Sequence, residues 1–137
     1  MKRTATAHWE GDLKTGKGSL STQSTVLNKS QYSFNTRFEN GVGTNPEELL
    51  AASHAGCFTM AISSILGQAG FQATSLDTTA AVTLEGLAIT AVHLSVKGKV
   101  PNITAEKFAE VTKAAEQNCL ISKVLSIPIT SDAELLK

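Results

Sequence analysis

Cysteine, proline and aromatic residues are all scarce in this sequence. The 137 residues include two cysteines, three prolines and only 5% aromatic side chains. The cysteines, Cys57 and Cys119, cannot supply four zinc ligands, and none of the three histidines has a metal-ligand spacing to them. We therefore expect no metal site and no other cofactor.

The sequence also has no excess of charge of either sign. Twelve basic and twelve acidic residues give a net charge of zero, and no basic cluster exceeds the pair Lys2 and Arg3. This balance excludes the electrostatic footprint of a nucleic-acid-binding protein. Residues 4–12 contain no apolar segment of a signal peptide. The longest apolar run, 49–66, is interrupted by polar residues, which favours a core or interface helix over a membrane span.

These absences leave a cytoplasmic globular protein. The length suits one domain, residues 1–137, with its own core. A reducing compartment disfavours a permanent structural disulfide. The simplest interpretation of two cysteines there is that both are small buried hydrophobic residues.

One long helix dominates the pattern. Asn45 is a favoured N-cap residue, Pro46 suits the first helical position, and Glu47 and Glu48 complement the helix dipole. Glu48 can also complete a capping box with Asn45. The following residues are small or apolar nearly all round, which predicts a helix that is buried on most sides, with Cys57 at its middle.

Alternating segments surround this helix. Period-two patterns and turn residues predict strands at 4–10, 19–26, 32–39, 75–84, 87–100 and 126–133. A second helix is expected from Thr104 to Asn118, followed by a possible helical turn over 120–125. The order βββ-α-ββ-α-β predicts an α+β domain with antiparallel sheets.

Cys57 is the candidate nucleophile, and a thiol reacts only as the thiolate. The N-terminus of the helix is too distant to lower its pKa, because Glu47 lies about 15 Å away along the axis. His54, one turn before Cys57, and Arg37, in the preceding segment, are the possible cationic partners. Both residues also have a plainer interpretation: His54 as a hydrogen-bonded core histidine, and Arg37 as a solvated surface arginine.

The motifs together resemble the OsmC/Ohr family of thiol-dependent organic hydroperoxide reductases. The resemblance covers nearly the whole chain and favours the OsmC branch. It rests on His-Trp-Glu-Gly-Asp at 8–12, Phe-Asn-Thr-Arg-Phe-Glu at 34–39, Asn-Pro-Glu-Glu-Leu at 45–49, Ala-Ala-Ser-His-Ala-Gly-Cys-Phe at 51–58, and Cys119. One departure is Leu120, because the family usually has proline directly after the second cysteine.

The resemblance implies roles for individual residues. Cys57 matches the peroxidatic cysteine and Cys119 the resolving cysteine. Arg37 matches the arginine that holds the thiolate and polarises the peroxide, and Glu47 matches its carboxylate partner. Phe58 and Phe38 are the candidate substrate contacts.

The implied fold is an intertwined homodimer that uses an organic hydroperoxide as substrate and an external dithiol as reductant, in defence against oxidative and osmotic stress. In the implied reaction Cys57 becomes a sulfenic acid and then forms a disulfide with Cys119. Because an unbroken helix keeps Glu47 away from Cys57, we expect Arg37 or Glu47 to act across the dimer interface. Two alternatives stay open: a cysteine hydrolase or acyltransferase that uses Cys57 with His54, and a non-catalytic dimer that binds a small apolar ligand.

Overall fold

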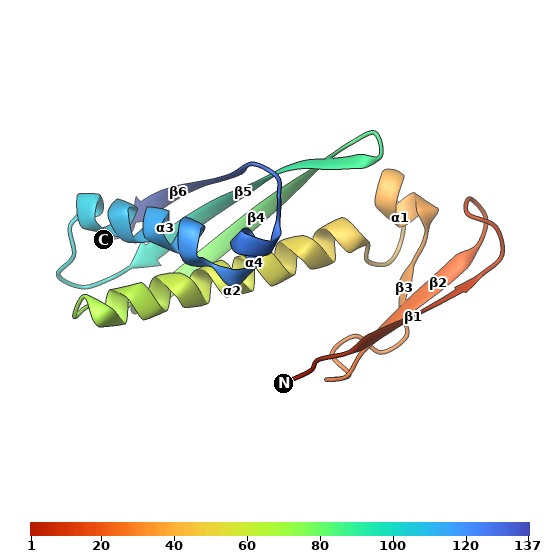
Figure 1. Cartoon of the computed structure of the whole chain (residues 1–137), viewed down its shortest axis with the longest axis horizontal. Coiled ribbons are helices and arrows are strands. Elements are labelled where there is room, and N and C mark those ends of the chain that lie inside the picture. The colour runs from red at the N-terminus through yellow and green to blue at the C-terminus, as the bar shows by residue number, and fades with distance from the viewer. The chain divides into compact units, whose positions relative to one another are not determined.

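Six strands and four helices follow one another in the order β1-β2-β3-α1-α2-β4-β5-α3-α4-β6 in the computed structural model, which describes all 137 residues (Figure 1). The α+β class expected from the sequence is confirmed. The chain divides into two compact units, Met1–Leu49 and Leu50–Lys137. That these units form one domain stays a prediction.

The first unit is built on a small antiparallel sheet. Its strands pair in the order β1-β2-β3, with bounds β1 (Ala5–Glu10), β2 (Lys17–Thr22) and β3 (Ser30–Tyr32). The rings of Trp9 and Tyr32 pack 5.5 Å apart between centroids. Gly18 lies beneath them, and a Cβ atom there would collide with both rings. The glycine therefore allows the two aromatic side chains to cover the sheet.

The predicted strand at 32–39 is wrong. The structure instead has the short helix α1 (Phe34–Phe38). Ser33 and Thr36 form a reciprocal capping box: the Thr36 N–H donates to Ser33 Oγ over 3.3 Å, and the Ser33 N–H donates to Thr36 Oγ1 over 2.9 Å. This local cap outweighs the alternating pattern, which on its own favoured a strand.

Helix α2 (Pro46–Gln68) begins as the sequence predicts. The Glu48 N–H donates to Asn45 Oδ1 over 2.7 Å, so Asn45 is the N-cap. The expectation that α2 is buried on most sides is not met within one chain. Only one stripe with a spacing of four is buried after the first turn, and it consists of His54, Phe58, Ile62 and Leu66. By length and composition alone, α2 is long and apolar enough to cross a membrane.

The second unit has a mixed sheet rather than the expected antiparallel one. Its strands are β4 (Ser75–Glu85), β5 (Ala88–Lys99) and β6 (Ile129–Leu135). β4 and β5 form the predicted hairpin, but β6 pairs in parallel with β5. The chain crosses over between them through α3 (Ala105–Asn118) and α4 (Leu120–Val124), and such a crossover returns the strand in the parallel direction.

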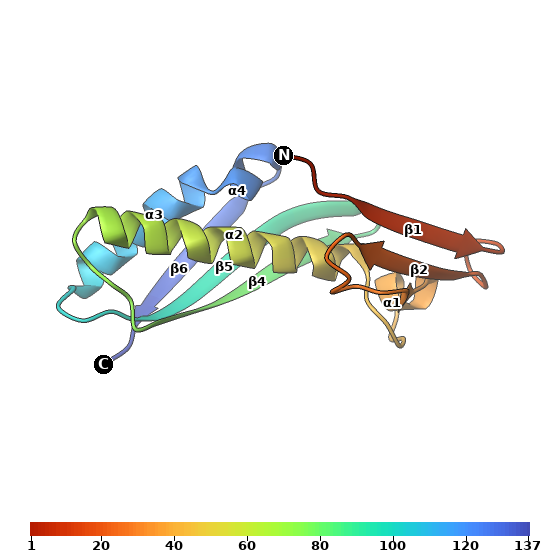
Figure 2. The ribbon, with the colours of Figure 1, turned by 90° about the horizontal axis from the view of Figure 1, so that it is seen from below.

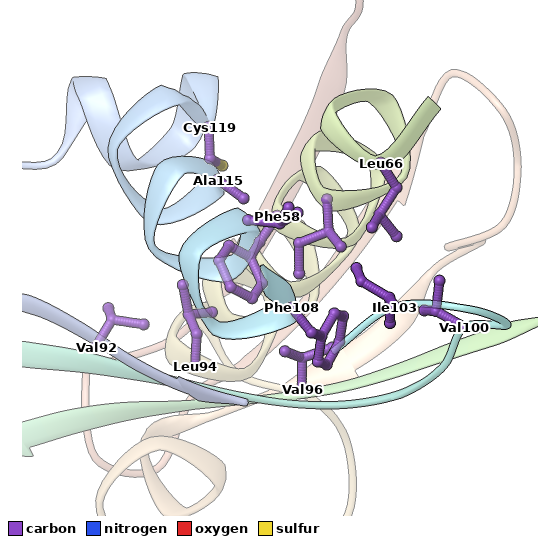
Figure 3. Packing of buried hydrophobic residues seen from close by; sticks show 12 residues of the cluster. Phe58, Leu66, Val92, Leu94, Val96, Val100, Ile103, Phe108, Ala115 and Cys119 are labelled. Carbon is purple, nitrogen blue, oxygen red and sulfur yellow. The ribbon is translucent and has the colours of Figure 1, made fainter. Parts of the chain in front are cut away.

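Helices α2 and α3 cover the same face of this sheet (Figures 1 and 2). Phe58 from α2 and Phe108 from α3 are fully buried between the helices and the central strand, together with Leu94 and Val96 (Figure 3). Phe108 lies directly over Gly98, where any Cβ atom would collide with the ring. Cys119 lies at the far end of this core, just beyond Ala115 on α3 (Figure 3). The core therefore holds α3 against the sheet and fixes its C-terminal end.

Candidate functional site

The two cysteines meet where α2 passes the junction of α3 and α4. Cys57 is in the middle of α2 and partly exposed, whereas Cys119 is 1% exposed. Cys119 both ends α3 and precedes α4, with the non-helical backbone angles φ −56° and ψ 129°. Its thiol is hydrogen-bonded to Cys57, and no disulfide joins them. We call Cys57 and Cys119 the thiol pair.

Cys57 is the more acidic member of the thiol pair. Burial by itself would raise the pKa of Cys57. Hydrogen bonds from the Cys119 thiol and from the backbone N–H groups of Ile121 and Leu120 outweigh this effect and lower the pKa. These donors stabilise the thiolate, so Cys57 is the better nucleophile of the two.

Cys119 is shifted in the opposite direction. Burial raises the pKa of Cys119, and its hydrogen bond to Cys57 raises it further, while the Ser122 hydroxyl partly opposes both. Cys119 is therefore held as a neutral thiol beside a more acidic Cys57. This asymmetry suits a pair in which Cys57 reacts first and Cys119 second.

An open, mainly apolar cavity of about 500 Å³ leads to the thiol pair. It is lined by Ser53, Cys57, Met60, Ala61, Asn118, Cys119, Leu120 and Ile121. Met60 and Leu120 are largely exposed, at 75% and 70%. The cavity can therefore bring a small apolar molecule to Cys57.

Arg37 and Glu47 form an ion pair within the first unit. Arg37 Nε donates to Glu47 Oε1 over 2.9 Å, and the Arg37 side chain is 42% exposed whereas that of Glu47 is 10% exposed. The second carboxylate oxygen of Glu47 is buried without a partner. The guanidinium also lies 5.3 Å from the centre of the Phe38 ring. Helix α1 and the start of α2 thus present Arg37 with a fixed orientation and free donors.

The side chain of His54 contacts Ser122, whereas the sequence suggested Cys57 as its partner. Its side chain is completely buried, and Nε2 lies 2.8 Å from Ser122 Oγ. Burial lowers the pKa of His54, so the imidazole is neutral. Ser122 gave no signal in the sequence beyond its place three residues after Cys119, because the contact with His54 spans 68 positions.

Neither of the two phenylalanines is among the residues that line the cavity. Phe58 is completely buried in the core between α2 and the sheet, and it does not line the cavity (Figure 3). Phe38 packs on Phe34 in the first unit, with ring centroids 4.8 Å apart. Met60 and Leu120 do line the cavity, but the sequence did not single them out as substrate contacts.

The fold and the thiol pair define an α+β protein with a partly exposed, more acidic cysteine beside a buried second cysteine. Residues 38–134 match the family model described as OsmC-like protein. The chain is 53% identical to "Peroxiredoxin OsmC" of Escherichia coli K12 over 133 residues, which covers 94% of this chain and 93% of the relative. "Peroxiredoxin OsmC" of Shigella flexneri matches to the same extent. This chain belongs to the OsmC family.

Solved structures support the same fold. The organic hydroperoxide resistance protein OhrB of Bacillus subtilis superposes with a TM-score of 0.71 at 25% identity, covering 97% of this chain and 98% of that one. An OsmC-like protein of Vibrio cholerae gives a TM-score of 0.74 at 13% identity, with 97% and 99% coverage. The second likeness concerns the fold alone.

Proposed function

We propose that this chain is a thiol-dependent peroxidase that reduces organic hydroperoxides to alcohols. The observation that carries the proposal is the thiol pair itself. Cys57 has a lowered pKa, a buried thiol lies beside it, and an apolar cavity opens onto it. Family membership agrees with this role, since the relatives named peroxiredoxin are 53% identical to this chain over 133 aligned residues.

The chemistry follows from the environment of each sulfur. The Cys57 thiolate attacks the outer oxygen of the hydroperoxide, the O–O bond breaks, and the alkoxide leaves as the alcohol after it takes up a proton. Cys57 is now a sulfenic acid. Cys119 then attacks Cys57, a disulfide forms and water leaves. An external dithiol restores both thiols by exchange.

The substrate class follows from the cavity. Its lining is mainly apolar, with Met60 and Leu120 at the exposed rim. Burial of a hydrocarbon tail there contributes about 25 cal/mol per Å² of apolar surface removed from water. Hydrogen peroxide has no such tail, so we expect organic hydroperoxides to react faster.

The remaining roles concern Arg37 and Glu47. Arg37 stabilises the thiolate and the charge that develops on the leaving oxygen, and Glu47 orients Arg37 through the ion pair. Helix α2 is unbroken between Glu47 and Cys57, so about 15 Å of helix separates their backbones. We infer a cytoplasmic homodimer in which the ion pair of one subunit faces the thiol pair of the other.

The competing hypothesis of a cysteine hydrolase or acyltransferase is not supported by a specific contact. It requires His54 to act as a base on Cys57, but the only hydrogen-bond partner of His54 is Ser122. The hydrolase hypothesis also assigns no role to Cys119. A non-catalytic dimer likewise has no use for the shifted pKa values of the thiol pair.

The test follows the thiols after one equivalent of tert-butyl hydroperoxide is added to the reduced protein. We expect both thiols to disappear, the intact mass to fall by two hydrogens and tert-butanol to form. Cys57→Ser should abolish all three changes, whereas Cys119→Ser should still form the alcohol once and keep one oxygen on Cys57. The proposal fails if the wild-type protein keeps both thiols and the peroxide is not consumed.

A further inference from the structure

A chain of hydrogen bonds runs from Cys119 into the protein interior, away from the cavity. The Ser122 hydroxyl contacts the Cys119 sulfur, and Ser122 Oγ lies 2.8 Å from His54 Nε2. His54 is completely buried on α2, and Ser122 is half-buried on α4. The other ring nitrogen of His54, Nδ1, is buried without any partner. Ser122 is therefore the only group with which His54 can exchange a proton.

Cys119 needs such a partner in order to react. It is 1% exposed, so bulk water and hydroxide have little access to its proton. Burial and the neighbouring Cys57 both raise the pKa of Cys119, so only a small fraction is thiolate at neutral pH. Attack on a sulfenic acid requires that the proton leaves as the S–S bond forms. The titratable groups that face Cys119 are Cys57 and, through Ser122, His54, both from α2.

We propose that Ser122 and His54 form a proton relay that deprotonates Cys119 while it attacks the Cys57 sulfenic acid. Ser122 is the catalytic residue of this relay because it touches the reacting thiol. His54 acts through Ser122 and is a positioning residue that also stores the proton. The inference rests on the proposed function and concerns its second step alone.

The step balances without an additional reactant. The Cys119 proton passes to Ser122 Oγ, and the Ser122 hydroxyl proton passes to His54 Nε2. The Cys119 sulfur bonds to the Cys57 sulfur, and the S–O bond of the sulfenic acid breaks. Cys57 is reduced from the sulfenic state and Cys119 is oxidised. The hydroxide leaves Cys57 into the cavity and takes up a proton from solvent there, and His54 later gives its proton back through Ser122, so one water molecule is formed overall.

The neutral state of His54 fits this role. A neutral imidazole accepts a proton only on its unprotonated nitrogen, so the relay requires the tautomer in which Nδ1 carries the hydrogen and Nε2 accepts from Ser122. A purely structural histidine would be expected to satisfy both ring nitrogens in a buried site. The unpartnered Nδ1 of His54 is a cost that a core apolar residue would avoid.

The test separates the two steps of the reaction in Ser122→Ala. Reduced protein is mixed with tert-butyl hydroperoxide, quenched in acid at increasing times and weighed intact. The sulfenic acid adds one oxygen, and the disulfide removes two hydrogens. General base catalysis is worth about 10²–10⁴-fold, so we expect disulfide closure to slow by at least about a hundredfold. Oxygen uptake by Cys57 should keep its rate, and a dimedone adduct of Cys57 should accumulate.

A structural role would not change the pH profile of closure, whereas loss of a relay would. Without the relay, closure depends on preformed Cys119 thiolate, so its rate should rise about tenfold per pH unit below the pKa of Cys119. In the wild type the slope should be much smaller. Ser122→Thr keeps a hydroxyl and should restore the wild-type profile. His54→Gln keeps a hydrogen bond to Ser122 but cannot take a proton, and it should behave like Ser122→Ala.

Ser126→Ala is the matched control, since Ser126 is exposed two residues after the end of α4. It should close the disulfide at the wild-type rate. The relay is refuted if Ser122→Ala closes at the wild-type rate with an unchanged pH slope. It is also refuted if Ser122→Thr stays as slow as Ser122→Ala in a folded protein. If even the wild type takes up no oxygen on Cys57, the proposed function fails, and the relay fails with it.

Discussion

The ion pair and the thiol pair differ in how the two members of each pair affect each other's charge. In the ion pair, Arg37 and Glu47 both carry charge, and each stabilises the charge of the other across 2.9 Å. In the thiol pair, burial raises the pKa of Cys119, and the hydrogen bond between the two thiols raises it further while it lowers the pKa of Cys57. The ion pair therefore supplies a fixed field, and the thiol pair supplies two groups that react in a set order.

Helix α2 carries one member of each pair. Glu47 lies in its first turn and Cys57 lies ten residues later, in a different unit of the chain. The partners come from elsewhere: Arg37 from α1, and Cys119 from the junction of α3 and α4. A substitution can therefore alter either pair without touching the other.

The largest effect is expected from removing the positive charge of the ion pair. Arg37→Met should lower kcat/KM for tert-butyl hydroperoxide by about a hundredfold to a thousandfold, the cost typical of losing one preorganised donor to developing negative charge. Far-UV circular dichroism should be unchanged. Arg3→Met, at the exposed N-terminus, is the control and should keep full activity. A loss smaller than about threefold in Arg37→Met would remove Arg37 from the reaction.

Hybrid dimers sharpen this prediction. One subunit carries Cys57→Ser and the other carries Arg37→Met, each with its own affinity tag, and the mixed dimer is purified on both tags. If the ion pair serves the partner's thiol pair, one site of the hybrid has intact Cys57 and Arg37, and about half of the wild-type activity returns. If each ion pair serves its own chain, neither site is complete and the hybrid stays as weak as Arg37→Met.

The next largest effects are expected from two glycine substitutions, which compare the stability of the two units. Gly18→Ala in the first unit and Gly98→Ala in the second each place a methyl group against packed aromatic rings. Such overpacking should cost about 1–3 kcal/mol of unfolding free energy. Trp9 is the only tryptophan and packs beside Gly18, so its fluorescence follows the first unit alone.

The two probes decide whether the chain is one cooperative domain. If it is, Gly98→Ala lowers the urea midpoint seen by Trp9 as much as the midpoint seen by circular dichroism. If the units unfold separately, Gly98→Ala leaves the Trp9 transition in place while Gly18→Ala shifts it. The first outcome supports the single domain expected from the chain length, and the second contradicts it.

Local chemistry made part of the fold predictable. The start of α2 followed from Asn45 and Pro46, and the hairpin of β4 and β5 from two alternating runs around Gly86. The segment 32–39 misled because its alternation favoured a strand, whereas Ser33 and Thr36 cap a helix. The parallel direction of β6 depends on where α3 packs, which no local pattern encodes.

The candidate site was predictable to a similar extent. The resemblance pointed to both cysteines, Arg37 and Glu47, and the structure brings the members of each pair into contact. The contact of Ser122 with His54 joins positions 68 apart, so sequence spacing could not reveal it. Nor could spacing show that Phe58 faces the core while its neighbour Cys57 faces the cavity.

A smaller change tests how the ion pair is oriented. Glu47→Gln keeps an oxygen that can accept from Arg37 Nε but removes the charge. Because the hydrogen bond survives, we expect only about a tenfold fall in kcat/KM, equivalent to about 1.4 kcal/mol. Combined with Arg37→Met, it should cause almost no further loss, since the two residues act as one unit. Glu48→Gln, whose exposed side chain is outside the ion pair, is the matched control. Fully additive losses in the double variant would show that Glu47 acts without Arg37.

The smallest effect concerns a single N–H group at the thiol pair. Leu120→Pro removes the backbone donor that Leu120 offers to Cys57 and leaves that of Ile121. Loss of a donor to the thiolate should raise the pKa of Cys57. At neutral pH the thiolate fraction and the rate of peroxide reduction then fall several-fold. The pKa is measured by the pH dependence of iodoacetamide labelling at Cys57.

The backbone is already suited to this substitution. Leu120 is the first residue of α4, where a helix does not use the N–H, and Cys119 before it has the extended ψ of 129° that proline requires. Leu120→Ala is the control: it trims the cavity rim but keeps the N–H, so the pKa of Cys57 should not change. If the pKa rises equally in both variants, the side chain of Leu120 is responsible. If it rises in neither, the Cys119 thiol and Ile121 suffice, and the order of reaction in the thiol pair does not depend on residue 120.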